Sequence, residues 1–410
     1  MASYKNYDWS FLLLSKNVLR YENDYLEILF TVRRMIMKRD SSVELGRVLA
    51  CCIVIGVHIC LPAFVQDSYY DISRIFISCL VADGVAIFWF ITGFFLFKNV
   101  SYKKVLNKTF KNIGIPLIVF SCVCFYFSSW LFYDQPFLQG FVHTKEEYIN
   151  VIKTLLTWNN PVPSGSHLWY LYTYILIMLF FPVLLSFINY LEADSSCKRV
   201  KYFFVISFSI LMLNDITMNK FANFSLHAFS AVFPAAVEII YGHFLYKYKS
   251  YFKDKKWLLI TPVCFLGMNI IRAYLQYRNY YVDAANTHIL FWYTSIGVVC
   301  TTSLLIFCLC IGNYIKSKKV NKTICALGSF TFCIYMIHTY VIALLSKWGI
   351  TDRINKKLFE IFGDNLFEVM YTIILIVLVF VISLIVSCCI RFIKNFVLGV
   401  FNVIKEKKMI

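Results

Sequence analysis

Apolar segments of about one bilayer thickness constrain the fold of this chain more than any other feature of its sequence. A helix needs about 17 to 25 residues to cross the hydrocarbon core of a bilayer. Ten such segments fall near 45–65, 79–97, 112–133, 167–190, 201–214, 227–246, 257–273, 288–312, 325–346 and 367–393. The fifth and the seventh are the shortest. The sequence therefore predicts an all-α, polytopic membrane helix bundle with about ten transmembrane helices.

Composition and charge agree with a membrane protein. Of the 410 residues, 60% are hydrophobic and 15% are charged, and the mean hydropathy is +0.66; a soluble domain is nearer half apolar and a quarter charged. With the N-terminus in the cytoplasm, alternating loops place about three quarters of the 40 Lys and Arg inside, as the positive-inside rule requires. Both termini are then cytoplasmic. Topology and contact with anionic membrane lipids explain the net charge of +17, so no nucleic-acid partner is expected.

The chain divides into one large membrane domain with two flanking segments. Residues 1–43 form a cytoplasmic N-terminal extension, which is either an interfacial helix or lies partly upstream of a true start at Met35 or Met37. The membrane domain spans 44–396, and 397–410 is a basic cytoplasmic tail. Most of the fifteen Cys lie inside apolar segments, where cysteine packs as a small hydrophobe, so neither a metal nor a disulfide is expected.

Arg47 and His58 are the most informative polar residues, because both lie in the apolar stretch 44–64. Eleven residues of helix return to within about 20° of the same face and rise about 16 Å. Groups this polar are expected to face the interior of a membrane bundle. A guanidinium binds phosphate well, and a buried neutral imidazole can accept a proton, so the pair suits a coenzyme A thioester. The alternative is that Arg47 reaches the headgroups and His58 bonds a neighbouring helix.

Thr92, Gly93 and the lysines that follow them are candidates for binding the donor. Gly93 interrupts the second apolar segment, either to let two helices pack closely or to admit a narrow acyl-pantetheine arm. Lys98 and Lys111 belong to a cytoplasmic basic rim that would attract nucleotide phosphates. Ordinary positive-inside bias also accounts for such a rim.

Six further residues are candidates for substrate binding or support: His167, Trp169, Glu238, Ser329, Tyr335 and His338. Aromatic belts are routine at the outer interface, but an exposed imidazole beside a tryptophan can bind a sugar hydroxyl. An acid within a membrane helix is a functional candidate unless a partner such as Arg272 or a histidine neutralises it. Tyr335 and His338 share a helix face, where interhelical hydrogen bonding is the simpler explanation.

From Met37 onward the chain resembles the membrane acyltransferase 3 family. The family's motifs are Arg-X10-His, preceded by Ser-Val-Glu-Leu; Phe-Phe-X-X-Ser-Gly-Phe, here FWFITGF; His-Leu-Trp-Phe-Leu, here with Tyr170 for Phe; and Ser-X5-Tyr-Leu-X-His, here with Met336 for Leu. In this chain the first motif runs from Arg47 to His58, and the Ser-Val-Glu-Leu segment before it is 42–45. The other three motifs, in the same order, are Phe88 to Phe94, His167 to Leu171 and Ser329 to His338. Thr92 replaces the usual serine, and lysines, including Lys111, replace arginines ahead of the third helix.

The resemblance implies ten-helix proteins that move acyl groups, commonly acetyl, from coenzyme A to sugars or other envelope molecules. His58 would then be the catalytic base or a transient acyl carrier, and Arg47 would position the donor or the helix. We expect a multi-pass plasma-membrane acyltransferase, with 44–396 as its acyltransferase domain. It would use acetyl-CoA as co-substrate, without a metal, to modify a hydroxyl of a cell-envelope or exported glycan or a lipid-linked sugar.

Two other classes of protein compete with an enzyme. A polytopic transporter or flippase for a glycan or small molecule would use intramembrane Arg, His and Glu residues, but it predicts paired inverted repeats with broken helices. Gly93 and Pro234 do not correspond between halves of the chain in that way. A sensor or assembly factor would leave Arg47 and His58 without a role.

Overall fold

The computed structural model describes residues 39–60, 72–98, 101–132, 136–137, 143–156, 165–220, 232–281 and 294–407. All regular secondary structure in these ranges is helical, which confirms the all-α prediction. Most of the predicted N-terminal extension, residues 1–38, lies outside the described residues. The helix that contains the predicted basic tail continues to Lys407.

The helices follow the predicted apolar segments along the chain. In order they are α2 (Ser41–Cys60), α3 (Ile72–Leu80), α4 (Gly84–Leu96), α5 (Tyr102–Thr109), the π-helical turn η2 (Phe110–Gly114), α6 (Ile115–Phe132), α7 (Lys145–Leu156), the 3-10 turn η4 (Ser166–Leu168), α8 (Trp169–Leu179), α9 (Phe181–Glu192), α10 (Lys198–Lys220), α11 (Val232–Lys247), the 3-10 turn η6 (Lys249–Phe252), α12 (Trp257–Tyr281), α13 (Ser295–Tyr314), α14 (Lys318–Gly328), α15 (Thr331–Lys347) and α16 (Ile350–Lys407). The last of these contains a kink at Gly363, where the backbone is non-helical.

Six stretches of the described chain are long and apolar enough to cross a membrane. They are Ser41–Cys60, Ile72–Leu96, Tyr102–Ser128, Trp257–Arg278, Ser295–Tyr314 and Phe367–Phe396. Two bent pairs, α8 with α9 (66°) and α14 with α15 (58°), raise the number to eight if each pair is one span. Helices α10 and α11 cover the other two predicted segments and are not among these spans. The membrane bundle is confirmed, whereas the count of ten and the cytoplasmic termini stay predictions.

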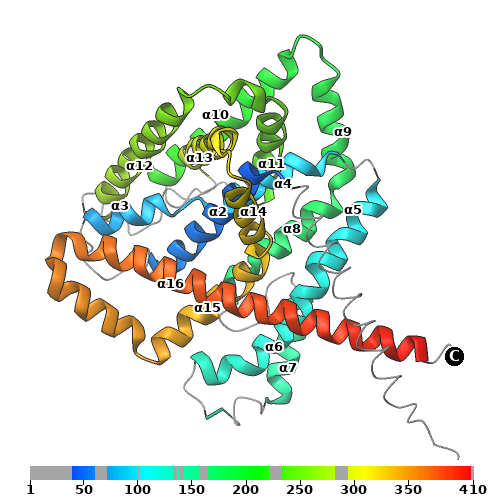
Figure 1. Cartoon of the computed structure of the whole chain (residues 1–410). Helices are drawn as coiled ribbons and strands as arrows, with labels where there is room; N and C mark the ends of the chain where they lie inside the picture. The colour runs from blue at the N-terminus through cyan, green and yellow to red at the C-terminus, as the bar shows by residue number, and fades with distance from the viewer. Residues whose placement is uncertain are drawn as a thin grey trace, which may run out of the picture.

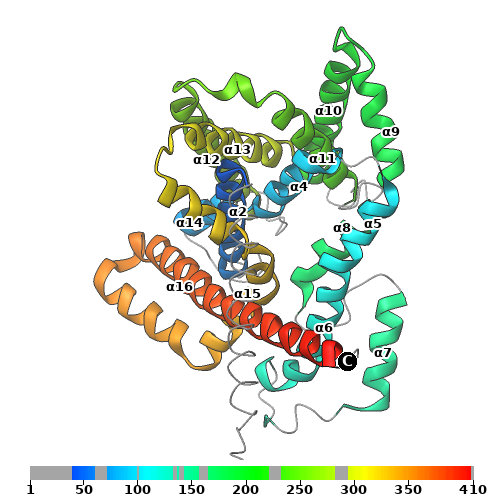
Figure 2. The ribbon, with the colours of Figure 1, turned by 45° about the vertical axis from the view of Figure 1, so that its right-hand side comes forward.

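Helix α2 lies in the middle of the bundle (Figures 1 and 2). It packs against α3, α4, α13, α14, α15 and α16. Small buried residues on α2, among them Gly46, Ala50 and Gly56, let these neighbours approach closely. As a result, the helix that carries Arg47 and His58 is enclosed by protein on several sides.

Helices α4 and α11 cross in backbone contact through two glycines. A Cβ on Gly93 would lie 2.8 Å from the carbonyl carbon of Ile239 and 2.9 Å from the amide nitrogen of His243. A Cβ on Gly242 would lie 2.6 Å from the carbonyl carbon of Phe90. Neither helix has room for a side chain at this point, so close packing alone accounts for Gly93.

A buried ion pair joins the break between α3 and α4 to α12. Arg272 makes two hydrogen bonds to Asp83, Nη1 to Oδ2 at 2.8 Å and Nη2 to Oδ1 at 3.0 Å. The side chains of Arg272 and Asp83 are 0% and 1% exposed. Arg272 is therefore neutralised by Asp83. The sequence alternative in which Arg272 pairs with Glu238 is not observed.

Candidate active site

Three histidines from distant parts of the chain meet inside the bundle. His58 comes from α2, His167 from the turn η4 and His338 from α15. The ring centroid of His58 lies 5.0 Å from that of His338 and 6.0 Å from that of His167, and the centroids of His167 and His338 are 5.2 Å apart. His338 is fully buried and His58 is partly buried. The imidazole of His58 thus faces other imidazoles in the bundle. We call these three residues the histidine cluster.

The hydrogen bonds of His338 define its tautomer. Its Nδ1 lies 2.6 Å from the carbonyl oxygen of Tyr335, one turn earlier on α15. Because a carbonyl oxygen only accepts, Nδ1 must carry the proton that is donated. In a neutral ring Nε2 then carries a lone pair. Among the described residues, this buried nitrogen has no hydrogen-bond partner. A buried polar atom left unpaired costs about 1–3 kcal/mol, so it needs an explanation.

His167 is held by hydrogen bonds on both ring nitrogens. Nε2 donates to the carbonyl oxygen of Met336 at 3.1 Å, and the hydroxyl of Thr339 lies 3.2 Å from Nδ1 and can donate to it. The hydroxyl of Tyr335 donates to the backbone carbonyl of His167. His167 is only 3% exposed, so the exposed imidazole expected beside Trp169 is not observed. Burial between η4 and α15 gives it a packing position in the histidine cluster.

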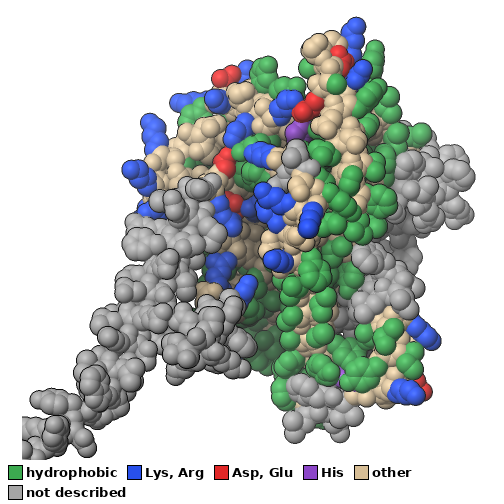
Figure 3. All heavy atoms as spheres, turned by 90° about the vertical axis from the view of Figure 1, so that its right-hand side faces the viewer, with side chains coloured by type: hydrophobic (Ala, Val, Ile, Leu, Met, Phe, Trp, Pro, Cys, Tyr) green, Lys and Arg blue, Asp and Glu red, His purple; other side chains and the backbone are tan. Residues whose placement is uncertain are grey.

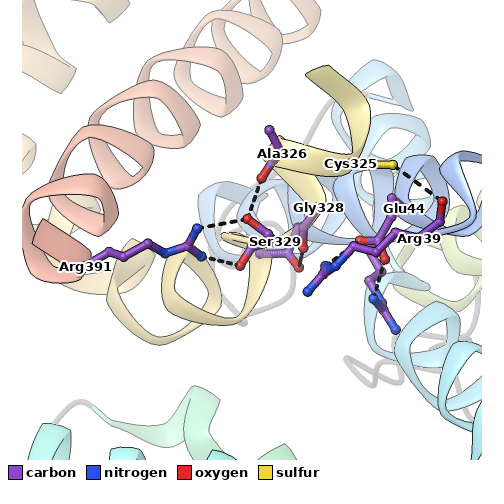
Figure 4. Close-up of polar contacts among 9 residues, drawn as sticks. Arg39, Glu44, Cys325, Ala326, Gly328, Ser329 and Arg391 are labelled. Carbon is purple, nitrogen blue, oxygen red and sulfur yellow. Dashed lines mark hydrogen bonds and ion pairs between the residues drawn. The ribbon is translucent and has the colours of Figure 1, made fainter. Parts of the chain in front are cut away.

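Arg47 is paired at the other end of α2, eleven residues from His58. Its Nη1 lies 2.6 Å from Oε1 of Glu44, and the other carboxylate oxygen, Oε2, accepts a hydrogen bond from Arg39 at 3.2 Å. The carboxylate of Glu44 is buried against Gly328 on α14, as Figure 4 shows. The Arg47 side chain as a whole remains 28% exposed. Glu44 was not singled out from sequence, although its i, i+3 spacing from Arg47 predicts the pair.

Aromatic side chains connect the histidine cluster with the Arg47 end. The ring of Tyr335 lies 5.9 Å from that of His167 and 5.6 Å from that of Tyr170. Tyr170 in turn lies 4.3 Å from Trp89, which is stacked 6.1 Å from Tyr174. At the other end of α2, the guanidinium carbon of Arg47 lies 5.9 Å from the ring centroid of Phe95. The interior between the two polar ends of α2 is therefore lined by rings, several of which carry hydroxyl groups.

Lys98 and Lys111 lie on an exposed basic surface formed by α5 and its neighbours. The ammonium of Lys98 lies 4.8 Å from the ring centroids of both Phe95 and Tyr246. Lys111, in the π-helical turn η2, borders an open hollow of about 490 Å³. The hollow is lined by Ser101, Lys103, Lys104, Asn107, Lys108, Lys111 and Asn112. Figure 3 shows Lys and Arg side chains gathered in the upper half of this face.

Thr92 and Ser329 make local hydrogen bonds away from the histidine cluster. The Thr92 hydroxyl donates to the carbonyl oxygen of Phe88 at 2.8 Å. The Ser329 hydroxyl, at the bend between α14 and α15, donates to the carbonyl oxygen of Ala326 at 2.7 Å. Arg391 on α16 donates to the hydroxyl and the carbonyl of Ser329 (Figure 4). Ser329 therefore stabilises a helix bend.

Glu238 and Trp169 complete the predicted site residues. Glu238 on α11 is 0% exposed, and among the described residues neither carboxyl oxygen has a hydrogen-bond partner. Trp169 is half-buried at the start of α8, with its ring centroid 6.4 Å from that of Tyr170. Neither belongs to the histidine cluster. Thr339 and Met336, which hold His167, were not predicted, because a contact between α15 and η4 leaves no spacing signal in the sequence.

The histidine cluster does not have the geometry of a metal site. Within the part of the chain that the structure describes, no group of three or more His, Cys, Asp or Glu residues could hold a metal ion. The ring nitrogens of His167 and the Nδ1 of His338 are directed at backbone or hydroxyl groups instead. The arrangement suits proton transfer by imidazole.

The fold and the site together define an integral membrane protein with imidazoles gathered in the interior of its bundle. The family model described as an acyltransferase domain, that of the membrane acyltransferase 3 family, matches residues 40–391. The chain therefore belongs to this family and is an acyltransferase, as the resemblance predicted. No curated protein and no solved structure matches it.

Proposed function

We propose that this enzyme moves an acyl group, most simply acetyl, from acyl-coenzyme A to a hydroxyl of a cell-envelope or exported glycan. The observation that carries the proposal is the position of His58 among buried imidazoles, on the same helix as Arg47 and about 16 Å from it. That separation suits a donor with a charged head and a long arm. The enzyme would act in the plasma membrane.

His58 supplies the proton chemistry of the transfer. Its neutral ring takes the proton of the acceptor hydroxyl while the hydroxyl oxygen attacks the thioester carbonyl carbon. The carbon–sulfur bond then breaks, and the departing thiolate takes the proton from the imidazolium. In a second route the ring nitrogen attacks the carbonyl carbon first and the carbon–sulfur bond breaks, which releases the thiolate. The acceptor hydroxyl then attacks this acyl group, the bond from the acyl carbon to the ring nitrogen breaks, and the hydroxyl proton passes to the thiolate. Both routes require a ring nitrogen with a free lone pair.

The donor head belongs at the Arg47 end of α2. The guanidinium of the partly exposed Arg47 side chain can bind a phosphate oxygen while Glu44 holds its other side. The basic hollow on α5, with four lysines in its lining, attracts the same phosphates electrostatically. Lysine lacks the two-pronged geometry of arginine, so this surface contributes attraction more than orientation.

Radiolabelled acetyl-CoA, supplied to membranes that contain the enzyme, tests the proposal. Label should appear in envelope glycan, and His58→Ala should abolish its transfer while the variant is still expressed and still binds coenzyme A. His243→Ala is the matched control, because the half-buried His243 pairs with Glu192 at 2.8 Å and lies outside the histidine cluster. Full transfer by His58→Ala would overturn the role of His58. Absence of label with the wild-type enzyme, when a glycan of known competence is present, would overturn this donor and acceptor.

A further inference from the structure

We propose that His338 is a positioning residue for His58: its Nε2 accepts the N–H of His58 and so leaves the other nitrogen of His58 with the free lone pair. This role rests on the proposed function for its catalytic consequence. The hydrogen bond itself does not depend on that function.

The orientation of the His338 ring determines what each of its nitrogens can bind. Its Nδ1–H is used by the carbonyl oxygen of Tyr335 at 2.6 Å. The ring can then offer only a lone pair at Nε2. That nitrogen is buried in a fully enclosed side chain. A donor is therefore required on the far side of the ring.

Among the described residues, three aromatic rings lie beside His338 and could supply this donor. These are His58, His167 and Tyr335. His167 uses both nitrogens, on Met336 and on Thr339, and the hydroxyl of Tyr335 donates to the carbonyl of His167. Of the three rings, His58 alone retains an N–H that is not already donated to a described residue.

The distance between the rings of His58 and His338 fits a hydrogen bond between them. An N–H···N bond of about 2.9 Å, plus roughly 1 Å from each nitrogen to its ring centre, separates two imidazole centroids by about 5 Å. The centroids of His58 and His338 are 5.0 Å apart, with the ring planes tilted by 55°. A small rotation of the partly buried His58 ring completes the bond without any movement of the helices.

The chemical consequence follows from proton balance. When His58 takes a proton from the acceptor hydroxyl it becomes an imidazolium, and both of its nitrogens then carry hydrogen. His338 Nε2 accepts one of these hydrogens throughout, so the proton that was gained sits on the opposite nitrogen. It is returned from there to the departing thiolate. Because His338 keeps its own proton on Nδ1, it orients the base and does not itself exchange protons with substrate.

Two substitutions at position 338 separate positioning from packing. Glutamine places an amide oxygen near the Nε2 position and can still accept from His58, whereas asparagine reaches only the Nδ1 position. His338→Asn should lower kcat for label transfer from acetyl-CoA about 100-fold, the lower end of what a correctly oriented general base contributes, with KM within about twofold. The kcat of His338→Gln should be at least tenfold higher than that of His338→Asn. His243→Asn, outside the histidine cluster, should match the wild type.

If kcat falls equally in His338→Asn and His338→Gln, or if only KM changes, then His338 contributes packing and does not position His58. ¹⁵N-histidine NMR of the enzyme in bilayers is a second measurement that needs no activity. With seven histidines in the chain, single variants assign the signals. The Nε2 signal of His338 should shift in His58→Ala. If the His338 Nε2 signal is unchanged in His58→Ala, the hydrogen bond between the two residues is wrong. If that signal shifts but the wild-type enzyme transfers no label, only the proposed function is wrong.

Discussion

Replacement of Gly93 by alanine is the sharpest test of the packing described above. The new Cβ would lie 2.8 Å from the carbonyl carbon of Ile239 and nearer still to its oxygen. Both belong to the backbone of α11, which cannot rotate away as a side chain can. Gly242→Ala places the same obstacle on the opposite helix, 2.6 Å from the carbonyl carbon of Phe90.

The size of the effect follows from the separation that the helices must adopt. Ordinary contacts begin near 3.4 Å, so the carbonyl carbon alone requires α4 and α11 to move apart by about 0.6 Å, and the nearer carbonyl oxygen requires more. Overpacking of a well-packed core costs about 1–3 kcal/mol. Since backbone faces backbone here, we expect Gly93→Ala to cost about 3 kcal/mol of the free energy of unfolding. The gain in helix propensity from Gly to Ala, about 0.5–1 kcal/mol, offsets only part of this.

Thermal unfolding in detergent, followed with a thiol-reactive fluorophore, measures the loss. Buried cysteines such as Cys300 and Cys308 become reactive only when the bundle opens. Gly267→Ala on α12 is the matched control, because among the described residues nothing beyond its chain neighbours and its own helix backbone lies within 4 Å of the added Cβ. Gly93→Ala and Gly242→Ala should melt well below the wild type, and Gly267→Ala at or slightly above it. A Gly93→Ala variant as stable as Gly267→Ala would refute the reasoning.

Two further predictions concern charged groups. Asp83→Ala leaves the Arg272 guanidinium buried without its partner and should cost about 3–5 kcal/mol. Adding Arg272→Met should restore most of that stability, because it removes the buried charge. A double variant that is no more stable than Asp83→Ala would contradict this explanation. Asp40→Ala should cost about 1 kcal/mol by removing the cap of α2. Burial opposes ionisation of Asp40, but hydrogen bonds from Ser42 and Lys249 outweigh it and hold the pKa below its usual 3.8. The contribution is therefore present above about pH 4 and lost as pH falls through the lower folded pKa. A difference in melting temperature between wild type and Asp40→Ala that grows on acidification would contradict this sign.

The fold class could be predicted from the sequence because the evidence for it, the length of each apolar segment, is local. Where the structure describes it, each predicted apolar segment falls on one helix or on two consecutive helices, since hydrophobic length is a property of consecutive residues. The bends between α8 and α9 and between α14 and α15 were not predicted. They depend partly on contacts with other helices, such as that of Arg391 with Ser329. The same limit applied to Glu238, whose suggested partner Arg272 proved to be bound to Asp83.

By itself, the sequence determined that the chain is a membrane helix bundle, that its family is one of acyltransferases, and that Arg47 and His58 share a helix face. Only the tertiary structure brought His167 and His338 beside His58, and only it showed which ring nitrogens of His167 and His338 make hydrogen bonds. The reason is physical. Helical periodicity orders residues along one helix, whereas the neighbours of a side chain across the bundle depend on how the helices pack, which no spacing in the sequence records.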